Sequence, residues 1–204
     1  MDFASFREKI AYQPILLGVF ALLASGALAW ASNATGDAIA AAEAKDLRDS
    51  LSEVLPKGFA DNDFLKDTLE IERAGKAVTI YRARQGGAVR GAVFKIAERG
   101  YAADIQVLMA VDAEGKTLGV RVLKHAETPG LGDKIEIAKN QWILDFNGKS
   151  LGDPAPGKWG VKKDSGVFDQ FAGATITPRA VVKAVKGGLE FYAAHRNEIL
   201  GEKS

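Results

Sequence analysis

The chain is organised around Asp169-Gln170-Phe171-Ala172-Gly173-Ala174-Thr175-Ile176-Thr177-Pro178, which crowds small residues and two threonines before a helix start. Thr177 stands where a helix N-cap is expected and Pro178 where the first helical residue is expected, because proline's missing N–H costs nothing there. Beyond Pro178 the apolar residues recur three or four positions apart, at Val181, Val185, Leu189 and Tyr192. The sequence therefore predicts a glycine turn followed by a capped helix that runs to about Arg196.

The start of this helix is a candidate site for an anionic ligand. A helix N-terminus presents free N–H groups and the positive end of the helix dipole, which favour phosphate. Ala172, Gly173 and Ala174 have small side chains, so the backbone and a phosphate-bearing ligand can approach closely. The same pattern is also typical of an ordinary turn before a capped helix. The residues alone leave open both a phosphate or flavin-phosphate site and a purely structural turn.

This stretch resembles the flavin-attachment motif, roughly D-x-x-S/T-G-A-T-x-S/T, of the G subunits of Rnf (Rsx) electron-transport complexes. The C subunits of the related sodium-pumping NADH:quinone reductases carry the same motif. In that family FMN is joined through its phosphate to the hydroxyl of the last Ser/Thr, so the resemblance implies a covalent phosphoester at Thr177. It also implies that Ala172, Gly173, Ala174 and Thr175 lie around the cofactor. Ala172 departs from the motif because it lacks the first hydroxyl.

A second stretch, His125-Ala126-Glu127-Thr128-Pro129-Gly130-Leu131-Gly132, leaves a predicted strand and enters a Pro-Gly turn. A single histidine at a strand end is more often structural than catalytic. The H-x-E-T-P-G-L-G pattern, however, is similar to a second hallmark of the same family, in which this loop lies beside the flavin. The resemblance therefore adds five candidate pocket residues, namely Glu127, Thr128, Gly130, Leu131 and Gly132.

Composition limits the chemistry that the chain supplies by itself. Its 204 residues, 47% hydrophobic and 26% charged, suffice for one ordinary core. A formal net charge of +1 offers no electrostatic reason for nucleic-acid binding. The absence of cysteine excludes disulfides, thiolate-bound iron–sulfur clusters and a catalytic thiol, and with two histidines we expect no metal site. If the protein carries electrons, it needs an organic cofactor.

The N-terminal part contains an apolar run. No charged residue occurs in 10–36, and we predict a single transmembrane helix over 14–34, because about 20 apolar residues cross a bilayer. Trp30 is expected near the outer interface. A cleaved signal peptide is the alternative, since Ala27-Leu28-Ala29 has the small residues of a cleavage site.

The basic residues around this run predict its orientation. Arg7 and Lys9 precede it, whereas the nearest basic residue after it is Lys45. The positive-inside rule then places residues 1–13 in the cytoplasm and the rest of the chain on the periplasmic side of the inner membrane.

Between the membrane helix and the two motifs, the pattern predicts mainly strands. Residues 35–75 are expected to form a helical stalk and a loop. The helix is predicted over 37–55, and the loop, with at most one helical turn, over 61–76. Residues 76–204 are expected to form the FMN-binding domain. Its predicted hairpins pair 78–84 with 88–96 around Gly86-Gly87, and 104–111 with 117–124.

The predicted fold class is α+β, an antiparallel sheet with helices packed against one face and a single N-terminal transmembrane helix. A helix followed by a short extended piece is expected over 135–146, with Trp142 in the core. Trp159 and Phe171 are aromatic candidates for stacking on a flavin, but core packing is the expected role for both.

The resemblance implies an electron carrier with covalent FMN. Its partners would be the other members of an Rnf-type complex, namely the A, D and E membrane subunits and the B and C peripheral subunits, and a flavin transferase during maturation. Such a complex couples electron transfer between ferredoxin and NAD to ion translocation. The chain has no G-x-G-x-x-G nicotinamide motif and no charge within its apolar run, so we expect no complete active site of its own. The alternative is a membrane-anchored protein without redox activity that binds a ligand or serves as a scaffold.

Overall fold

The structure, a computed structural model, describes residues 12–201. The chain divides into two compact units, Met1–Asp46 and Leu47–Ser204. Most of the predicted cytoplasmic segment, including Arg7 and Lys9, lies outside the described residues.

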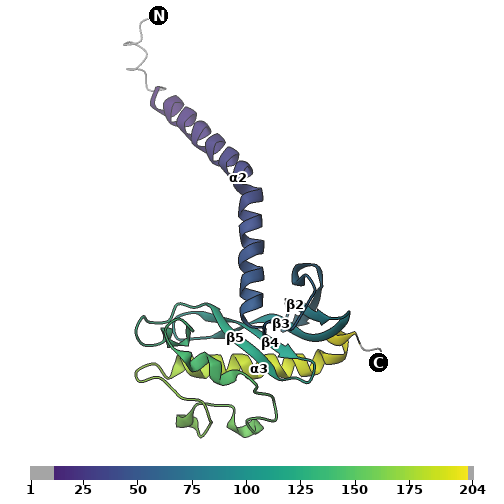
Figure 1. Ribbon diagram of the computed structural model, residues 1–204. Helices are drawn as coiled ribbons and strands as arrows, with labels where there is room; N and C mark the ends of the chain where they lie inside the picture. Colours follow the sequence, from purple (N-terminus) through teal and green to yellow (C-terminus); the bar gives the residue numbers. More distant parts are fainter. Residues whose placement is uncertain (1–11, 202–204) are drawn as a thin grey trace, which may run out of the picture. The chain divides into compact units, whose positions relative to one another are not determined.

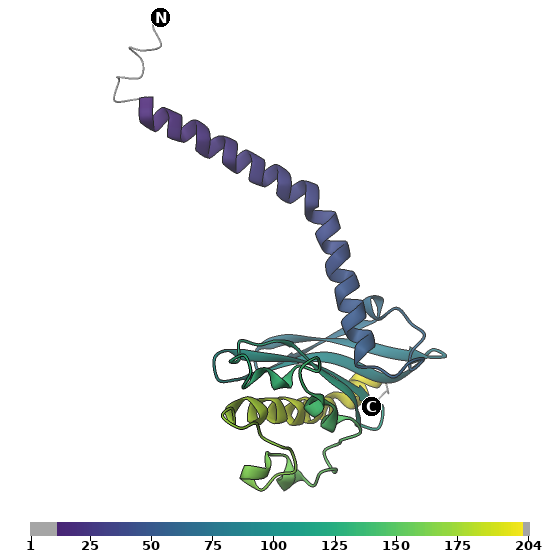
Figure 2. The same cartoon turned by 60° about the vertical axis from the view of Figure 1, so that its left-hand side comes forward.

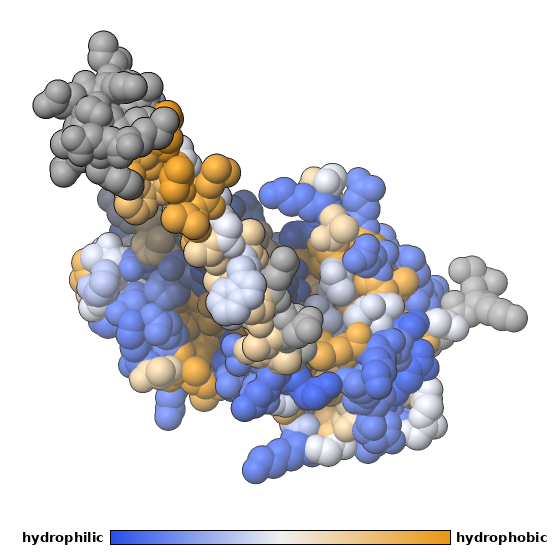
Figure 3. Space-filling view, turned by 90° about the horizontal axis from the view of Figure 1, so that it is seen from above, coloured by the Kyte–Doolittle hydropathy of each residue, from blue (hydrophilic) through white to orange (hydrophobic). Residues whose placement is uncertain are grey.

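The first unit consists of the N-terminal part of helix α2, Tyr12–Glu53. Within α2 the segment Gln13–Gly36 has 24 residues and a mean hydropathy of 2.0, which is long and apolar enough to cross a membrane. Its large side chains, Leu17, Leu22 and Trp30 among them, are exposed. Figure 3 shows hydrophobic residues in orange along the part of this helix that is in view. Apolar residues on all sides of an uncovered helix are typical of a membrane span.

Helix α2 is longer than the sequence pattern predicted. The expected membrane helix over 14–34 and the expected stalk helix over 37–55 are one continuous helix that ends at Glu53. No proline occurs between Pro14 and Pro56, and a single glycine such as Gly36 costs a helix only about 1 kcal/mol. The chain therefore has no reason to break the helix at the edge of the apolar run.

The second unit is built on a five-stranded antiparallel sheet in which neighbours in sequence are neighbours in space. Figure 1 shows the sheet, whose strands are β1 (Thr68–Arg73), β2 (Lys76–Gln85), β3 (Ala88–Arg99), β4 (Asp104–Asp112) and β5 (Thr117–Lys124). Both predicted hairpins are confirmed, since β2 pairs with β3 and β4 with β5. Gly86 and Gly87 have φ values of 59° and 83°, as a tight hairpin turn requires.

Strand β1 lies in the segment that was predicted to be a loop. There the structure has a 3-10 turn, η1 (Phe64–Lys66), followed by β1, which pairs with β2 along its whole length. Only Ile71 of this edge strand is buried, so the sequence of β1 has too little hydrophobic alternation to predict a strand. Pairing with β2 holds β1 in its extended conformation. The sheet thus begins before residue 76, the predicted start of the FMN-binding domain.

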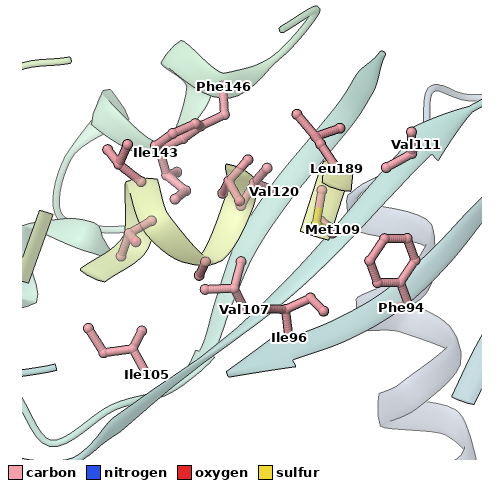
Figure 4. Close-up of a cluster of buried hydrophobic side chains, with 14 of the residues drawn as sticks. Phe94, Ile96, Ile105, Val107, Met109, Val111, Val120, Ile143, Phe146 and Leu189 are labelled. Atoms are coloured by element: carbon pink, nitrogen blue, oxygen red, sulfur yellow. The ribbon is translucent and has the colours of Figure 1, made fainter. Parts of the chain in front are cut away.

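One face of the sheet packs against helix α3 (Ile176–Leu200), which lies along it in Figures 1 and 2. The predicted apolar face of α3 is confirmed, since Val181, Val185, Leu189 and Tyr192 are all buried. Alternate residues of the strands meet this helix. Figure 4 shows the resulting core, to which Phe94, Ile96, Val107, Met109, Val120 and Leu189 belong.

The opposite face of the sheet is covered as well, contrary to the expectation of helices on one face only. Leu51 near the end of α2 and Val54 directly after it pack on Val93, Leu108 and Ala110. Strand β4 is therefore buried on both faces, which explains its nearly continuous apolar sequence.

The segment between β5 and α3 contains only short 3-10 turns: η2 (Asp133–Ile135), η3 (Gln141–Phe146), η4 (Pro156–Lys158) and η5 (Lys162–Asp164). The prediction for 135–146, a helix followed by a short extended piece, is therefore wrong. Asn140 interrupts it with extended backbone angles, and its side chain accepts the Trp142 N–H at 2.8 Å. Trp142 is in the core, as predicted, and its Nε1 donates to the Asp169 carbonyl at 3.0 Å. The indole thus holds the start of the stretch that leads into α3.

Candidate functional site

A cavity of about 220 Å³ lies where the loop after β5 meets the turn before α3. Eight of the predicted site residues line it, namely Glu127, Thr128, Leu131, Gly132, Gly173, Ala174, Thr175 and Thr177. Gly130 and Ala172 were also predicted but do not line it, whereas Tyr101 and Ile176 line it without having been predicted. The two motifs, far apart in sequence, thus form one site.

Helix α3 begins before the predicted position. Thr175 is its N-cap residue and Ile176 its first residue, so Thr177 lies inside the first turn and the prediction of Thr177 as N-cap is wrong. The Thr175 side chain makes no capping hydrogen bond; its carbonyl accepts the Arg179 N–H at 3.4 Å. Pro178 still falls in the first turn, where its missing N–H leaves no bond unmade. The earlier start turns Thr177 inward, with 2% of its surface exposed.

The Thr177 hydroxyl donates a hydrogen bond to Oε2 of Glu127. Glu127 is also buried, with 5% of its surface exposed, and its Oε1 accepts the N–H groups of Tyr101 at 3.0 Å and Ala102 at 3.4 Å. A Cβ atom on Gly132 would lie 2.8 Å from Thr177 Oγ1 and 2.9 Å from Glu127 Cβ. Only glycine therefore lets the loop approach this pair so closely.

His125 connects the strand end to this carboxylate. Its Nδ1 accepts the Glu127 N–H at 3.1 Å, and because a backbone N–H can only donate, the ring proton resides on Nε2. That nitrogen lies 2.9 Å from Glu136 Oε1 and donates to it. His125 thus has the structural role that was expected for a lone histidine, because its two hydrogen bonds fix the loop that carries Glu127.

A second buried carboxylate of the loop, Asp133, belongs to an ionic cluster. Lys139 Nζ lies 2.9 Å from Asp133 Oδ2 and 2.7 Å from Glu136 Oε1. Lys139 lowers the pKa of Asp133, helped by the Gly130 N–H, and lowers the pKa of Glu136, helped by His125. In return Glu136 and then Asp133 raise the pKa of Lys139. The cluster holds the end of the loop by charge.

The turn before α3 is held by packing. Its Ala174 N–H donates to the Phe171 carbonyl at 3.2 Å, and Gly173 has a φ of 80°, which favours glycine. Phe171 packs against Trp142 with ring centroids 5.1 Å apart, and Trp159 packs against Phe168 at 5.4 Å. Both aromatic candidates thus have the core-packing role that was expected, and neither lines the cavity.

The rim of the cavity is apolar and exposed. Tyr101, Leu131 and Ile176 expose 66%, 42% and 47% of their surfaces. Tyr101 lies in the connection between β3 and β4, and only the pairing of those strands with the rest of the sheet brings it beside Glu127. The sequence around it carries no signal that would have identified it.

Arg179, the basic residue in the first turn of α3, does not line the cavity and pairs with Asp164 instead. Its guanidinium makes two hydrogen bonds of 2.6 Å to the Asp164 carboxylate. This contact lowers the pKa of Asp164 and raises that of Arg179. No basic side chain that the structure describes lines the cavity, so the first turn of α3 is the feature there that favours an anion. Among residues 12–201 no cluster of His, Asp and Glu side chains has the arrangement of a metal site.

The comparisons with known proteins agree with this geometry. The sequence model of the family described as FMN-binding domain matches residues 100–190, which include every lining residue of the cavity. The G subunit of the ion-translocating oxidoreductase complex of Cereibacter sphaeroides is 52% identical over 187 residues, covering 91% of this chain and 85% of the relative. The protein of the same name from Stutzerimonas stutzeri is 45% identical over 190 residues, covering 93% of this chain and 83% of the relative.

The crystal structure of NqrC from Shewanella oneidensis is 24% identical, with 72% of this chain and 74% of that chain covered and a TM-score of 0.49. The match of the FMN-binding-domain model to residues 100–190 shows that the chain contains such a domain. The chain belongs to the family of the G subunits of ion-translocating oxidoreductase complexes, as the two motifs predicted.

Proposed function

We propose that this chain is a membrane-anchored electron carrier whose FMN is bound covalently through its phosphate to Thr177. One observation carries the proposal: the Thr177 hydroxyl lies in the cavity that both family motifs line, within the FMN-binding domain. FMN supplies a ring that accepts and releases electrons. The protein supplies the tether, the pocket and the membrane anchor.

The residues of the cavity suit this cofactor. The N–H groups of Ile176 and Thr177 belong to the first turn of α3 and have no partner within the helix, so they favour phosphate. Gly173 and Ala174, which also line the cavity, have small side chains that leave room for a ligand. At about 220 Å³ the cavity is smaller than the roughly 300–1,000 Å³ of typical ligand pockets, so part of a bound FMN extends over the apolar rim. A flavin that is partly exposed is accessible to electron-transfer partners.

The proposal extends to an Rnf-type complex. In it, the A, D and E membrane subunits and the B and C peripheral subunits are the partners, and electrons pass between ferredoxin and NAD while an ion crosses the membrane. The apolar segment Gln13–Gly36 contains no charged residue and offers no ion path. This chain is therefore one step of the relay, and the reaction belongs to the assembled complex.

A periplasmic location of the domain is part of the same proposal. It rests on Arg7 and Lys9, which precede the apolar segment. Protease added to intact spheroplasts should cleave the domain and leave a tag at Met1 intact. A domain that resists cleavage until the cells are lysed would contradict this orientation without affecting the cofactor assignment.

The attachment itself is tested by co-expressing the full chain with a flavin transferase. After denaturing electrophoresis the wild-type band should fluoresce, and the peptide that contains Thr177 should be heavier by FMN minus water. Thr177→Ala should abolish the fluorescence, whereas the matched Thr175→Ala variant should retain the attachment point. Flavin found on Thr175 would overturn the assignment, and a non-fluorescent wild type would favour a ligand-binding or scaffold protein that carries no covalent flavin.

A further inference from the structure

We propose that Glu127 is the general base in the attachment of flavin to this chain, and that it accepts the Thr177 hydroxyl proton when the phosphoester forms. This inference rests on the proposed attachment at Thr177. A threonine hydroxyl is a weak nucleophile and needs a base within hydrogen-bond reach. The chain itself, and not only the transferase, supplies that base.

The contact between the two side chains has the required direction. Thr177 Oγ1 donates to Glu127 Oε2, so the proton already points at the carboxylate oxygen that would receive it. The other oxygen, Oε1, is held by the N–H groups of Tyr101 and Ala102, which fixes the orientation of the carboxylate. Of the residues that line the cavity, only Glu127 and Tyr101 carry titratable groups.

The carboxylate of Glu127 has no cationic partner among the described residues. Its partners in the described part of the chain are two backbone N–H groups and a hydroxyl, and no basic side chain pairs with it. His125 contributes a neutral ring nitrogen to the Glu127 backbone rather than a charge to its side chain. A carboxylate neutralised by lysine or arginine would be a weaker base.

Formation of the Thr177 phosphoester requires a flavin phosphoanhydride as the second reactant, because the phosphate of free FMN has no good leaving group. The Thr177 Oγ1–P bond forms as the anhydride P–O bond breaks, and the departing phosphate takes the bonding electron pair. The hydroxyl proton moves to Glu127 Oε2 and from there to solvent or to the departing phosphate. No electron is gained or lost by the protein.

The test compares rates of attachment in vitro, using the full chain in detergent, purified transferase and a flavin phosphoanhydride. Glu127→Gln keeps the shape of the side chain, but its oxygen is needed by the two backbone N–H groups, so its NH₂ faces Thr177 and cannot accept a proton. We expect attachment to slow by about 100-fold or more, the usual contribution of a general base. Glu98→Gln is the matched control, because Glu98 pairs with Lys183 and does not line the cavity.

The pH dependence separates a base from a residue that only positions the hydroxyl. The ratio of the wild-type to the Glu127→Gln attachment rate cancels the transferase's own pH dependence. This ratio should fall towards one as pH rises, because hydroxide can then take the proton in place of Glu127. A Glu127→Gln rate close to that of the wild type, or a ratio that is constant with pH, overturns the inference. If Glu127→Gln lowers the melting temperature, Glu127→Asp and Glu127→Asn are compared instead, because the two shorter side chains differ only in the carboxylate. An attachment rate for Glu127→Asp well above that for Glu127→Asn supports the base, and equal rates contradict it. A wild type that acquires no flavin at Thr177 refutes the proposed function instead.

Discussion

Glu127 and Asp133 are two buried carboxylates of one loop, and within the part of the chain that the structure describes only Asp133 has a charged partner. Asp133 is paired with Lys139 at 2.9 Å, whereas Glu127 is held by backbone N–H groups and the Thr177 hydroxyl. Lys139 lowers the pKa of Asp133, so that group stays ionised and holds the loop. Glu127 has no such cation and faces the cavity. One loop thus carries a carboxylate for structure and another for chemistry, and the position of one lysine separates them.

The contact between Glu127 and Thr177 depends on Gly132, and replacing that residue should have the largest effect. Gly132→Ala places a Cβ 2.8 Å from Thr177 Oγ1, which forces the loop away from the helix start. We expect attachment to fall severely and the free energy of unfolding to drop by about 1–3 kcal/mol, the usual cost of overpacking. Chemical denaturation and fluorescence of the denatured band measure the two effects.

Gly157→Ala is the control for this change, because no atom lies within 4 Å of its new Cβ. A Gly132→Ala protein with normal stability and normal attachment would show that the loop does not need this close approach.

The Asp133 side of the comparison is tested by Lys139→Met, which should have an intermediate effect that depends on pH. In the folded protein the pKa values of Asp133 and Glu136 are lowered by Lys139, so their contribution is present above their unfolded values of about 4 and is lost as pH falls through the folded values. The raised pKa of Lys139 keeps its contribution present up to about pH 10. Lys139→Met should therefore lower the melting temperature at pH 7, and the difference from wild type should shrink below pH 4.

Thermal unfolding at several pH values checks this expectation. The control is Lys183→Met, which removes a more exposed lysine paired with Glu98 and should change the melting temperature less. A difference between wild type and Lys139→Met that persists unchanged in acid would show that lysine packing, and not charge, holds the loop.

The smallest effect is expected at the rim. Leu131 lines the cavity and lies near Gly173 of the facing turn, so Leu131→Ala should admit water beside a bound flavin and shift its visible spectrum or redox potential slightly. Attachment should persist, because the hydroxyl and Glu127 are untouched. Ile137→Ala, a change at an exposed residue that does not line the cavity, is the control. Identical spectra for both variants would place the ring away from Leu131.

Much of the fold follows from local patterns. The two hairpins and the buried face of α3 were predictable because alternation and helical spacing record which side of an element is buried. Strand β1 was missed because an edge strand with one buried residue has almost no pattern of its own. The helix and short extended piece expected over 135–146 were wrong because Asn140 and tertiary contacts of Trp142 favour short turns there.

By itself the sequence determined the family and the apolar segment, and it predicted Thr177 as the flavin acceptor, because motifs, hydropathy and spacing are local properties of the chain. Only the tertiary structure decided that α3 begins at Ile176, and that Thr177 therefore points inward to Glu127. The same holds for Tyr101 at the rim and for Lys139 beside Asp133 rather than Glu127. The partner of a buried side chain is set by how the sheet, the loop and the helix pack together, and no run of neighbouring residues encodes that geometry.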